Sequence, residues 1–337
     1  MTAAPDVYFE EGYGRAAAVA ERARWDEVVL ADGAWRMPLL LRELPSGRLD
    51  AASPYGYSGV FADPSLDAGT IAGLWDETRR ELASRGIVSV FVRTSPLVGQ
   101  APAPEDATWV VKGHDTFYVP CRGYDQNWDD YQGRARTSVR KCQKLGLSVQ
   151  IAPAAAADLA ADGDFRELYE QTMGKVSATD FYHFGDDYYA ALLDGLGENL
   201  LLGMVRDEQG APQAAALFMR GARHLHYHLS GSTRDGMRAG ATTMVLDAAI
   251  KLANELGLEG LELGGGVHSG DGLEKFKASF GGEKRVFTAY GLIADADAHE
   301  VEIQASAERQ GVDVAALREP GFFPAYRRTI APTAEED

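Results

Sequence analysis

The chain has 337 residues, of which 45% are apolar and 25% are charged. These fractions are typical of a folded globular protein and exclude a disordered chain, a collagen-like chain and a coiled coil. The formal net charge of −17 arises from 33 basic and 50 acidic residues. It argues against a general nucleic-acid coat protein, because neutralising phosphates requires a positive face. A local basic patch for one phosphate-bearing substrate is still compatible with this charge.

The length suits about two domains of roughly 150 residues each. Cys121 and Cys142 are too few for a disulfide scaffold and lack the spacing of metal ligands. Residues 1–6 lack the basic start and apolar core of a signal peptide. No run approaches the roughly 18–20 apolar residues of a membrane span. We therefore expect a cytoplasmic protein without a membrane span, whose oligomeric state the sequence leaves open.

The first half of the chain predicts an α/β unit. Helices are expected at residues 14–23, which are rich in alanine, and at 67–84, which carry an apolar stripe. The Gly- and Pro-rich segment 53–59, with Tyr55 and Tyr57, predicts a loop. Short apolar runs between turn residues predict strands at residues 27–30, 35–44, 48–52, 87–92, 108–111 and 116–119.

Residues 125–145 predict a helix that ends at Gly146 and carries the main basic cluster of the protein. Its five cations, with no acid from position 134 to 144, are Arg134, Arg136, Arg140, Lys141 and Lys144. One interpretation is an ordinary solvated helix face. The other is an anion site, because arginine makes bidentate contacts with phosphate and the rest of the chain is strongly acidic.

The second half of the chain loosely repeats the order of the first. The Ala-rich run 154–161 follows a strand at 148–151 and is expected to connect two domains. Helices are then predicted at 165–176, 186–196, 239–256 and 272–280, and strands at 200–205, 214–220, 224–230, 261–263 and 286–293.

Three histidines at alternate positions of one predicted strand, His224, His226 and His228, share one face of it. His-x-His on a strand can bind zinc, but no cysteine or further ligand spacing completes a set, so we expect no metal. One of these histidines acting as an acid or base in a cleft fits the pattern better. The alternative without chemistry is a polar sheet face.

The Gly-rich segment 230–241 joins that strand to a long helix. Free backbone N–H groups at a helix N-terminus suit an anion, although an ordinary turn explains the glycines as well. Acetyltransferases of the GNAT superfamily bind the pyrophosphate of acetyl-CoA at such a loop with the pattern Gln/Arg-x-x-Gly-x-Gly/Ala. Thr233 and Met237 stand three residues before Gly236 and Gly240, so this signature is absent.

The most specific segment is 261–281, where a short strand runs into three glycines that permit close backbone approach to a ligand. A short helix then presents Phe276 beside Lys277, in the pattern Gly-Leu-x-x-Phe-Lys-x-x-Phe-Gly. The glycines are Gly264, Gly265 and Gly266. Without a ligand, the same residues would form a flexible turn and a surface lysine.

This pattern resembles the Fem family of peptidoglycan-bridge aminoacyltransferases. These enzymes are built as two GNAT-like domains in tandem and move an amino acid from aminoacyl-tRNA to an amine of a cell-wall precursor. Parts of 169–189 resemble the opening of the family's second domain, and parts of 210–231 its central hairpin. The basic helix resembles the end of the first domain. The paired heptad helices of some members are missing, and the two tyrosines of 53–59 look specialised.

The resemblance implies an α/β fold of two tandem GNAT-like domains with mixed central sheets flanked by helices. The first is expected at 1–147, completed by about 301–330, and the second at 148–300. The implied activity is an N-acyltransferase that uses aminoacyl-tRNA as donor and an amine of a peptidoglycan precursor, small molecule or peptide as acceptor, with no cofactor. The alternatives are an acyl-CoA-dependent N-acyltransferase and a non-catalytic GNAT-like ligand-binding protein.

In the family, the lysine of the Phe-Lys pair binds the donor's phosphates and stabilises the charge of the transition state. By position, this lysine is Lys277 here. His228, Asp271 and Glu274 are candidates for the group that accepts the amine's proton, and the sequence gives no order of preference among them. The predicted catalytic residues are Lys277, His228 and Asp271. The predicted substrate-binding residues are Tyr55, Tyr57, Arg136, Arg140, Lys141, Tyr227, Gly264, Gly265, Gly266 and Phe276.

Overall fold

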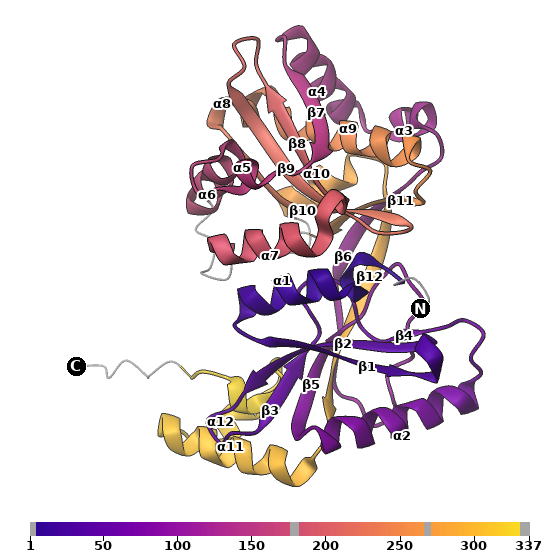
Figure 1. Cartoon of the computed structure of the whole chain (residues 1–337), viewed down its shortest axis with the longest axis vertical. Coiled ribbons are helices and arrows are strands. Elements are labelled where there is room, and N and C mark those ends of the chain that lie inside the picture. Colours follow the sequence, from indigo (N-terminus) through magenta and orange to yellow (C-terminus); the bar gives the residue numbers. More distant parts are fainter. Residues whose placement is uncertain (1–4, 176–181, 266–270, 331–337) are drawn as a thin grey trace. The chain divides into compact units, whose positions relative to one another are not determined.

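The computed structural model describes residues 5–175, 182–265 and 271–330 (Figure 1). They form two compact units. Unit 1 contains residues 22–113 and 287–330, and unit 2 contains 5–21 and the described part of 114–286. None of the described helices is long and apolar enough to cross a membrane.

The sheet of unit 1 contains β1 (Arg24–Leu30), β2 (Trp35–Glu43), β3 (Leu49–Ala52), β4 (Phe61–Ala62), β5 (Ile87–Arg93) and β12 (Glu283–Ile293). Its strand order is β1-β2-β3-β5-β12, with β4 beside β2. Only the β3–β5 pair is parallel. Parallel neighbours need a crossover connection, which α2 (Ala68–Ser84) supplies.

Helices cover both faces of this sheet. On one face Trp75 of α2 meets Trp35 of β2 edge to face, with ring centroids 4.9 Å apart. On the other, α11 (Ala296–Gln310) and α12 (Val314–Leu317) form a second apolar cluster with Tyr326. Short 3-10 turns complete the unit at η2 (Ala31–Gly33) and η5 (Ala325–Arg327).

The sheet of unit 2 contains β6 (Thr108–Pro120), β7 (Ser148–Pro153), β8 (Leu200–Arg206), β9 (Pro212–Arg220), β10 (His224–Ser232) and β11 (Gly260–Gly265). Its order is β6-β11-β10-β9-β8-β7, and only β10 and β11 are parallel. The run β8-β9-β10-β11-β6 therefore repeats the pairing of β1-β2-β3-β5-β12. Two units of the same mixed-sheet design stand in one chain, as predicted.

The helices of unit 2 are η1 (Val7–Phe9), α1 (Glu11–Glu21), α3 (Tyr124–Asp130), α4 (Gly133–Lys144), α5 (Ala156–Leu159), α6 (Asp164–Lys175), α7 (Asp186–Leu196), η4 (Gly197–Asn199), α8 (Arg234–Ala239), α9 (Ala241–Glu255) and α10 (Gly272–Ala278). α9 packs on the strands and forms the centre of the unit's main apolar core. α6 contacts β10, and α1 packs along α7 (Figure 1).

The division between the units differs from the expected domains at 1–147 and 148–300. Residues 5–21 and 114–147 belong to unit 2, because α1 packs on α7 and α4 packs on α9. Residues 287–300 belong to unit 1 with the rest of the C-terminal segment, because β12 pairs with β5. The Ala-rich run 154–161 is not an interdomain connection, since it lies within unit 2 and forms α5 there.

Two expected helices are each divided, and two expected strands are joined. The helix expected at 125–145 breaks between α3 and α4, where the backbone N–H of Gln132 donates to the carbonyl of Ser279, 2.9 Å away. The helix expected at 239–256 breaks at Gly240, whose φ of 94° is the left-handed conformation that favours glycine. The strands expected at 108–111 and 116–119 form the single strand β6.

The close contact of α1 and α7 yields a test of the fold. A Cβ on Gly12 would lie 2.1 Å from the carbonyl oxygen of Gly195, and backbone cannot move aside as a side chain can. We expect Gly12→Ala to lower the free energy of unfolding by about 1–3 kcal/mol, measured by urea denaturation. Gly73→Ala in α2 is the control, because its Cβ would meet no atom within 4 Å and alanine favours a helix. Equal stability of the two variants would contradict this packing.

Candidate active site

The carboxyl end of β11 carries a buried acid. Leu261 and Leu263 point into the main core of unit 2, whereas Glu262, between them, is on the other face of the strand and only 2% exposed. One carboxylate oxygen, Oε1, accepts a hydrogen bond from the N–H of Gly264 at 3.0 Å. A glycine at the end of the strand thus supplies a backbone donor to the acid.

A buried lysine of α10 approaches the same end of β11. The Asp271 side chain accepts a hydrogen bond from the N–H of Glu274 at 2.6 Å and so starts the helix. Lys277 lies near its end, is 6% exposed, and donates from Nζ to the carbonyl of Gly265 at 2.8 Å. Its Nζ also lies 5.7 Å from the centre of the Tyr227 ring, within cation–π range.

Burial shifts both ionisable groups toward neutrality. It raises the pKa of Glu262 to about 7, although the charges of His226 and Lys277 oppose the rise. It lowers the pKa of Lys277 to about 8, against the attraction of Glu262 and Asp271. A carboxylate that gains a proton near pH 7 is suited to general-base work, and the lysine beside it supplies a positive charge.

A second buried acid–base pair lies beside Glu262. His226 is in register with Glu262 across the parallel β10–β11 pair, and its Nε2 lies 2.7 Å from Oδ1 of Asp6. Both side chains of this pair are only 1% exposed. The attraction of Asp6 raises the pKa of His226 even though burial opposes it. Asp6 reaches the sheet because η1 and α1 pack in unit 2.

Sequence reasoning missed Glu262, His226 as a partner of Asp6, and Asp6 itself. A signal for Glu262 was available, because an acid between two core leucines of a strand must lie on the opposite face. Asp6 carried no signal, since 220 residues separate it from His226.

His228 occupies a different environment from His226. A β-bulge between Tyr227 and Leu229 interrupts the alternation of β10. His228 Nε2 lies 2.6 Å from the hydroxyl of Tyr188, and burial together with the charge of His226 lowers the pKa of His228 to about 3. A neutral imidazole bonded to a tyrosine is better suited to holding that side chain than to acid catalysis. Within the described residues no cluster of three metal-ligand side chains occurs.

The structure brings together part of the predicted site. Lys277, Tyr227, Gly264 and Gly265 meet at the end of β11. Phe276 packs against the main core of unit 2, and Asp271 caps α10. Gly266 lies outside the described residues.

Two predicted residues belong to the other unit. Tyr55 and Tyr57 are in unit 1, where the ring of Tyr57 lies 5.3 Å from that of Phe287. Their participation in a site with the residues of unit 2 stays a prediction.

The predicted basic residues lie on α4, where they have different partners. Arg136 Nη1 donates to the carbonyls of Trp128, Asp129 and Tyr131 and so holds the end of α3. Lys141 Nζ donates to the carbonyl of Arg238 at 2.7 Å, in the last turn of α8. Arg140 lies over the Trp128 ring, 5.5 Å from its centre, and is exposed.

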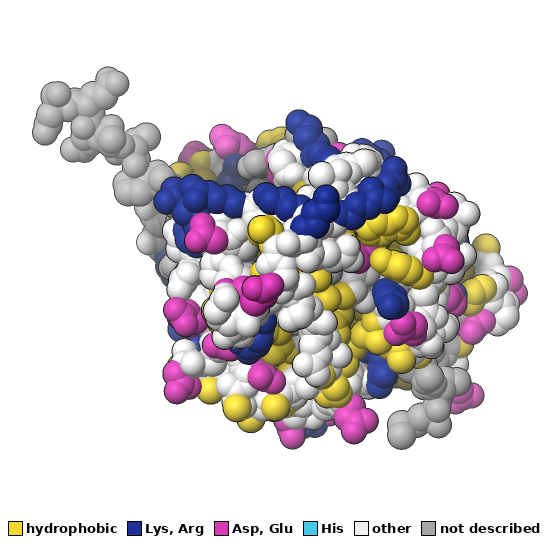
Figure 2. All heavy atoms as spheres, turned by 90° about the horizontal axis from the view of Figure 1, so that it is seen from above, with side chains coloured by type: hydrophobic (Ala, Val, Ile, Leu, Met, Phe, Trp, Pro, Cys, Tyr) yellow, Lys and Arg dark blue, Asp and Glu magenta, His cyan; other side chains and the backbone are white. Residues whose placement is uncertain are grey.

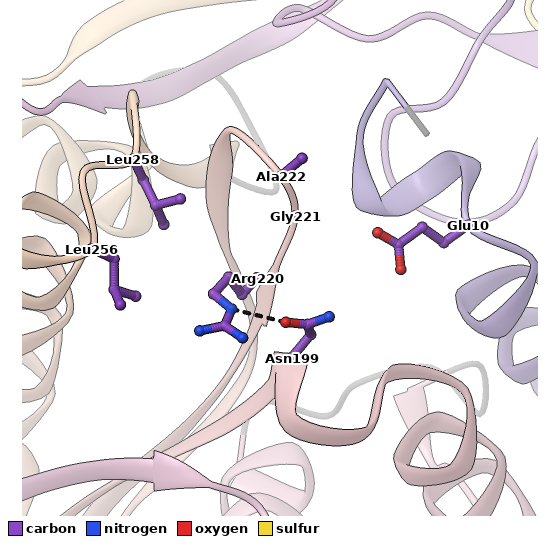
Figure 3. A pocket seen from close by; sticks show the side chains of 7 residues that line it. All are labelled: Glu10, Asn199, Arg220, Gly221, Ala222, Leu256 and Leu258. Carbon is purple, nitrogen blue, oxygen red and sulfur yellow. Dashed lines mark hydrogen bonds between the residues drawn. The ribbon is translucent and has the colours of Figure 1, made fainter. Parts of the chain in front are cut away.

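Two hollows in unit 2 lie away from the predicted cleft residues. One, of about 390 Å³, is lined by Glu10, Asn199, Arg220, Gly221, Ala222, Leu256 and Leu258 (Figure 3). The other, of about 530 Å³, lies between α5 and α7 and includes Tyr189. Neither hollow is lined by His228, Gly264 or Gly265.

Comparison with known proteins defines the class of this chain. Residues 129–278 match the family model described as an acetyltransferase (GNAT) domain. A search of curated protein sequences found no match. The matched region begins in α3 and ends with α10, so it contains the candidate site of unit 2.

Several solved structures share the fold over most of the chain. A structure of FemX is 14% identical, with a TM-score of 0.63, and the match covers 83% of this chain and 91% of that one. The C-terminal domain of a putative lysylphosphatidylglycerol synthetase from Agrobacterium fabrum is 14% identical, with a TM-score of 0.55 over 82% and 87% of the two chains. L-PGS from Bacillus licheniformis is 12% identical, with a TM-score of 0.52 over 86% and 92%.

These findings confirm the predicted fold of tandem GNAT-like units and the resemblance to Fem and GNAT-like proteins at the level of the fold. Residues 129–278 thus match a GNAT-type acetyltransferase domain, and this match supports the predicted transferase class of enzyme.

The raised pKa of Glu262 predicts a pH-dependent stability. The folded state holds the proton of the Glu262 carboxyl group more tightly than the unfolded state does. The stability that this group contributes to the fold is therefore fully present below about pH 4.5 and is lost as pH rises through about 7. We expect the free energy of unfolding of Glu262→Gln, relative to that of the wild type, to rise by about 2–3 kcal/mol between pH 4.5 and pH 7.5, measured by urea denaturation. Glu255→Gln, on the exposed side of α9, should show no such gain. Parallel pH profiles for wild type and Glu262→Gln would refute the shift.

Proposed function

We propose that this acyltransferase moves an aminoacyl group from aminoacyl-tRNA to an amine of a peptidoglycan precursor, a small molecule or a peptide. The observation that carries the proposal is an exposed basic surface on unit 2 that adjoins the helix of Lys277. The reaction needs no cofactor, because the ester of aminoacyl-tRNA is already activated. The proposed compartment is the cytoplasm, where charged tRNA is available.

The proposed chemistry uses the residues at the end of β11. The acceptor arrives as an ammonium ion and loses two protons, one to a base and one to the ribose oxygen. Its nitrogen attacks the ester carbonyl, a C–N bond forms, the C–O bond to the ribose breaks, and the ribose leaves as the hydroxyl with the second of these protons. Glu262, ionised above a pKa of about 7, takes the proton that the amine loses. The Lys277 ammonium, which donates to the Gly265 carbonyl, supplies a positive charge for the oxyanion. Holding both substrates together can itself contribute roughly 7–11 kcal/mol.

The basic surface consists of exposed cations on three helices: Arg134, Arg140, Lys141 and Lys144 of α4, Arg234 and Arg238 of α8, and Lys275 of α10. Figure 2 shows Lys and Arg side chains gathered in a band across the end of the molecule that carries α4. Arg134 donates to the carbonyl of Lys275, so the surface reaches the helix of Lys277. A band of this kind in a chain of charge −17 suits a polyanion.

Trp128 adds a feature suited to RNA. Its half-buried ring lies beneath the Arg140 guanidinium and beside the exposed cations. Single-stranded RNA is bound by stacking its bases on aromatic rings and arginine planes, next to cations that hold the phosphates. The resemblance to the Fem family supports this donor, and the solved structures with a similar fold include FemX and a domain of a putative lysylphosphatidylglycerol synthetase.

Acyl-CoA is the second candidate donor, favoured by the acetyltransferase name of the matched family model. One assay distinguishes between the two donors. Protein is incubated with a pool of charged tRNA or with an acyl-CoA pool, each with candidate amines, and donor loss and amide products are followed by mass spectrometry. We expect consumption of charged tRNA beyond its spontaneous hydrolysis. Consumption of acyl-CoA alone would overturn the proposed donor, and consumption of neither would favour a ligand-binding protein.

Lys277 and Lys275 form a matched pair for testing the site. We expect Lys277→Met to fold, since its side chain is buried, and to lose about 10²–10³-fold in kcat, the usual effect of removing one oxyanion contact. Lys275 is exposed two residues earlier, so Lys275→Met should keep near-normal kcat. Turnover would be measured with the native donor, and circular dichroism would check the fold. Normal turnover by Lys277→Met would mean that this motif is wrongly assigned.

Arg140 tests the basic surface. We expect Arg140→Glu to raise the apparent KM for the donor strongly and to reduce the slope of log KM against log salt concentration by about one. Arg309→Glu changes the net charge equally but lies on α11 of unit 1, where it is exposed. Its KM should stay near that of the wild type. Similar changes of KM in both variants would indicate a general effect of net charge. The cations of α4 would then form an ordinary solvated helix face without an anion site.

A further inference from the structure

Amide formation by this enzyme must release one proton to solvent in every turnover. At neutral pH the acceptor is an ammonium ion, and the sum of the reaction is ammonium plus ester giving amide, alcohol and H⁺. A thioester donor gives the same balance, with a thiol as the leaving product. Glu262 is 2% exposed, so a proton that it accepts needs a route out of the protein before the next turnover.

A row of acid–base groups leads away from Glu262 on the side of the N-terminal segment. His226 is the register partner of Glu262 on β10, and Asp6 contacts the far nitrogen of its ring at 2.7 Å. A Cβ on Gly221 would lie 3.1 Å from Oδ1 of Asp6, so Asp6 lies directly behind the lining of the 390 Å³ hollow. Figure 3 shows the Glu10 carboxylate pointing into this hollow from the side opposite Arg220 and Asn199.

Each buried member of this row has one polar atom without a hydrogen-bond partner among the described residues: Glu262 Oε2, His226 Nδ1 and Asp6 Oδ2. Unpartnered polar atoms of this kind are the partners that a buried water requires, and two of these residues, His226 and Glu262, are register partners on neighbouring strands. Other charged and titratable groups also face the row. Lys277 and Tyr118 act on Glu262, and Arg223 and His224 act on Asp6; His224 Nδ1 lies 3.2 Å from the Tyr118 hydroxyl. Partial burial, together with the charge of Asp6, raises the pKa of Glu10.

We propose that the proton taken up by Glu262 leaves through His226 and Asp6 to Glu10 and the solvent of the hollow. His226 receives it at Nδ1, and its Nε2 proton passes to Asp6. The proton on Nδ1 then moves to Nε2 through bridging water, so the ring regains its first tautomer without taking a proton back from Asp6. Asp6, His226 and Glu10 act through Glu262 and are positioning residues. The inference rests on the proposed role of Glu262 as base, but it holds for an ester or a thioester donor alike.

Glu10→Gln gives the cleanest test, because this residue is only partly buried and the change should leave the fold intact. We expect kcat near pH 7 to fall several-fold with unchanged KM, and added imidazole at rising concentration to restore it by carrying the proton from the hollow. Asp6→Asn and His226→Gln should lose more kcat, up to about 10²-fold, with the same KM. Glu198→Gln, an exposed acid next to Asn199, should behave as wild type.

The outcomes separate the route from the base. If Glu262→Gln is inactive while Glu10→Gln and Asp6→Asn keep wild-type kcat, the route is overturned and the proposed function stands. If Glu262→Gln keeps full turnover, the proposed base fails and the route fails with it. A loss in Glu10→Gln that imidazole does not restore, or that raises KM, would also overturn the route, since a structural role explains it.

Discussion

The burial of Glu262 at the end of β11 is the constraint on which the candidate site depends. Removing a carboxylate from water costs several kcal/mol unless donors and opposite charge compensate. Gly264 provides one donor through its backbone N–H, and Lys277 provides a charge nearby. Gly264 has a φ of 68°, the left-handed conformation that favours glycine, and the anchoring of α10 keeps the lysine in place.

The anchoring of α10 explains features that are distant in the sequence. Asp271 caps its first turn, and Gln132 ties its last turn to the loop before α4. α4 is in turn held by Arg136, which binds the carbonyls at the end of α3. The position of Lys277 therefore depends on a loop more than 140 residues earlier in the chain. The same connection joins the basic surface of α4 to the helix of the candidate site.

Neither unit is a contiguous piece of the chain. β6 begins in unit 1 and ends in unit 2, and β12 begins in unit 2 and ends in unit 1. The sheet of unit 1 consequently lacks its last strand until all of unit 2 has been made. Contacts that join distant residues form slowly, since a long loop must close before they contribute. The N-terminal segment is a further long-range contact, because Asp6 pairs with a histidine 220 residues away.

The sequence alone determined the local elements and the class of fold, because apolar periodicity and turn residues act over a few positions. α7 and the strands β8 to β10 lie where the pattern predicts them, and the Phe276–Lys277 motif indicated a GNAT-like acyltransferase. The tertiary structure decided what each polar side chain does. Of the cations on α4, Arg136 holds backbone carbonyls while Arg140 stays exposed over Trp128, a difference that helical spacing does not encode. Glu262, His226 and Asp6 meet only because β10, β11 and η1 pack together. Burial then raises the pKa of Glu262, whereas the charge of Asp6 raises the pKa of His226 against the effect of burial.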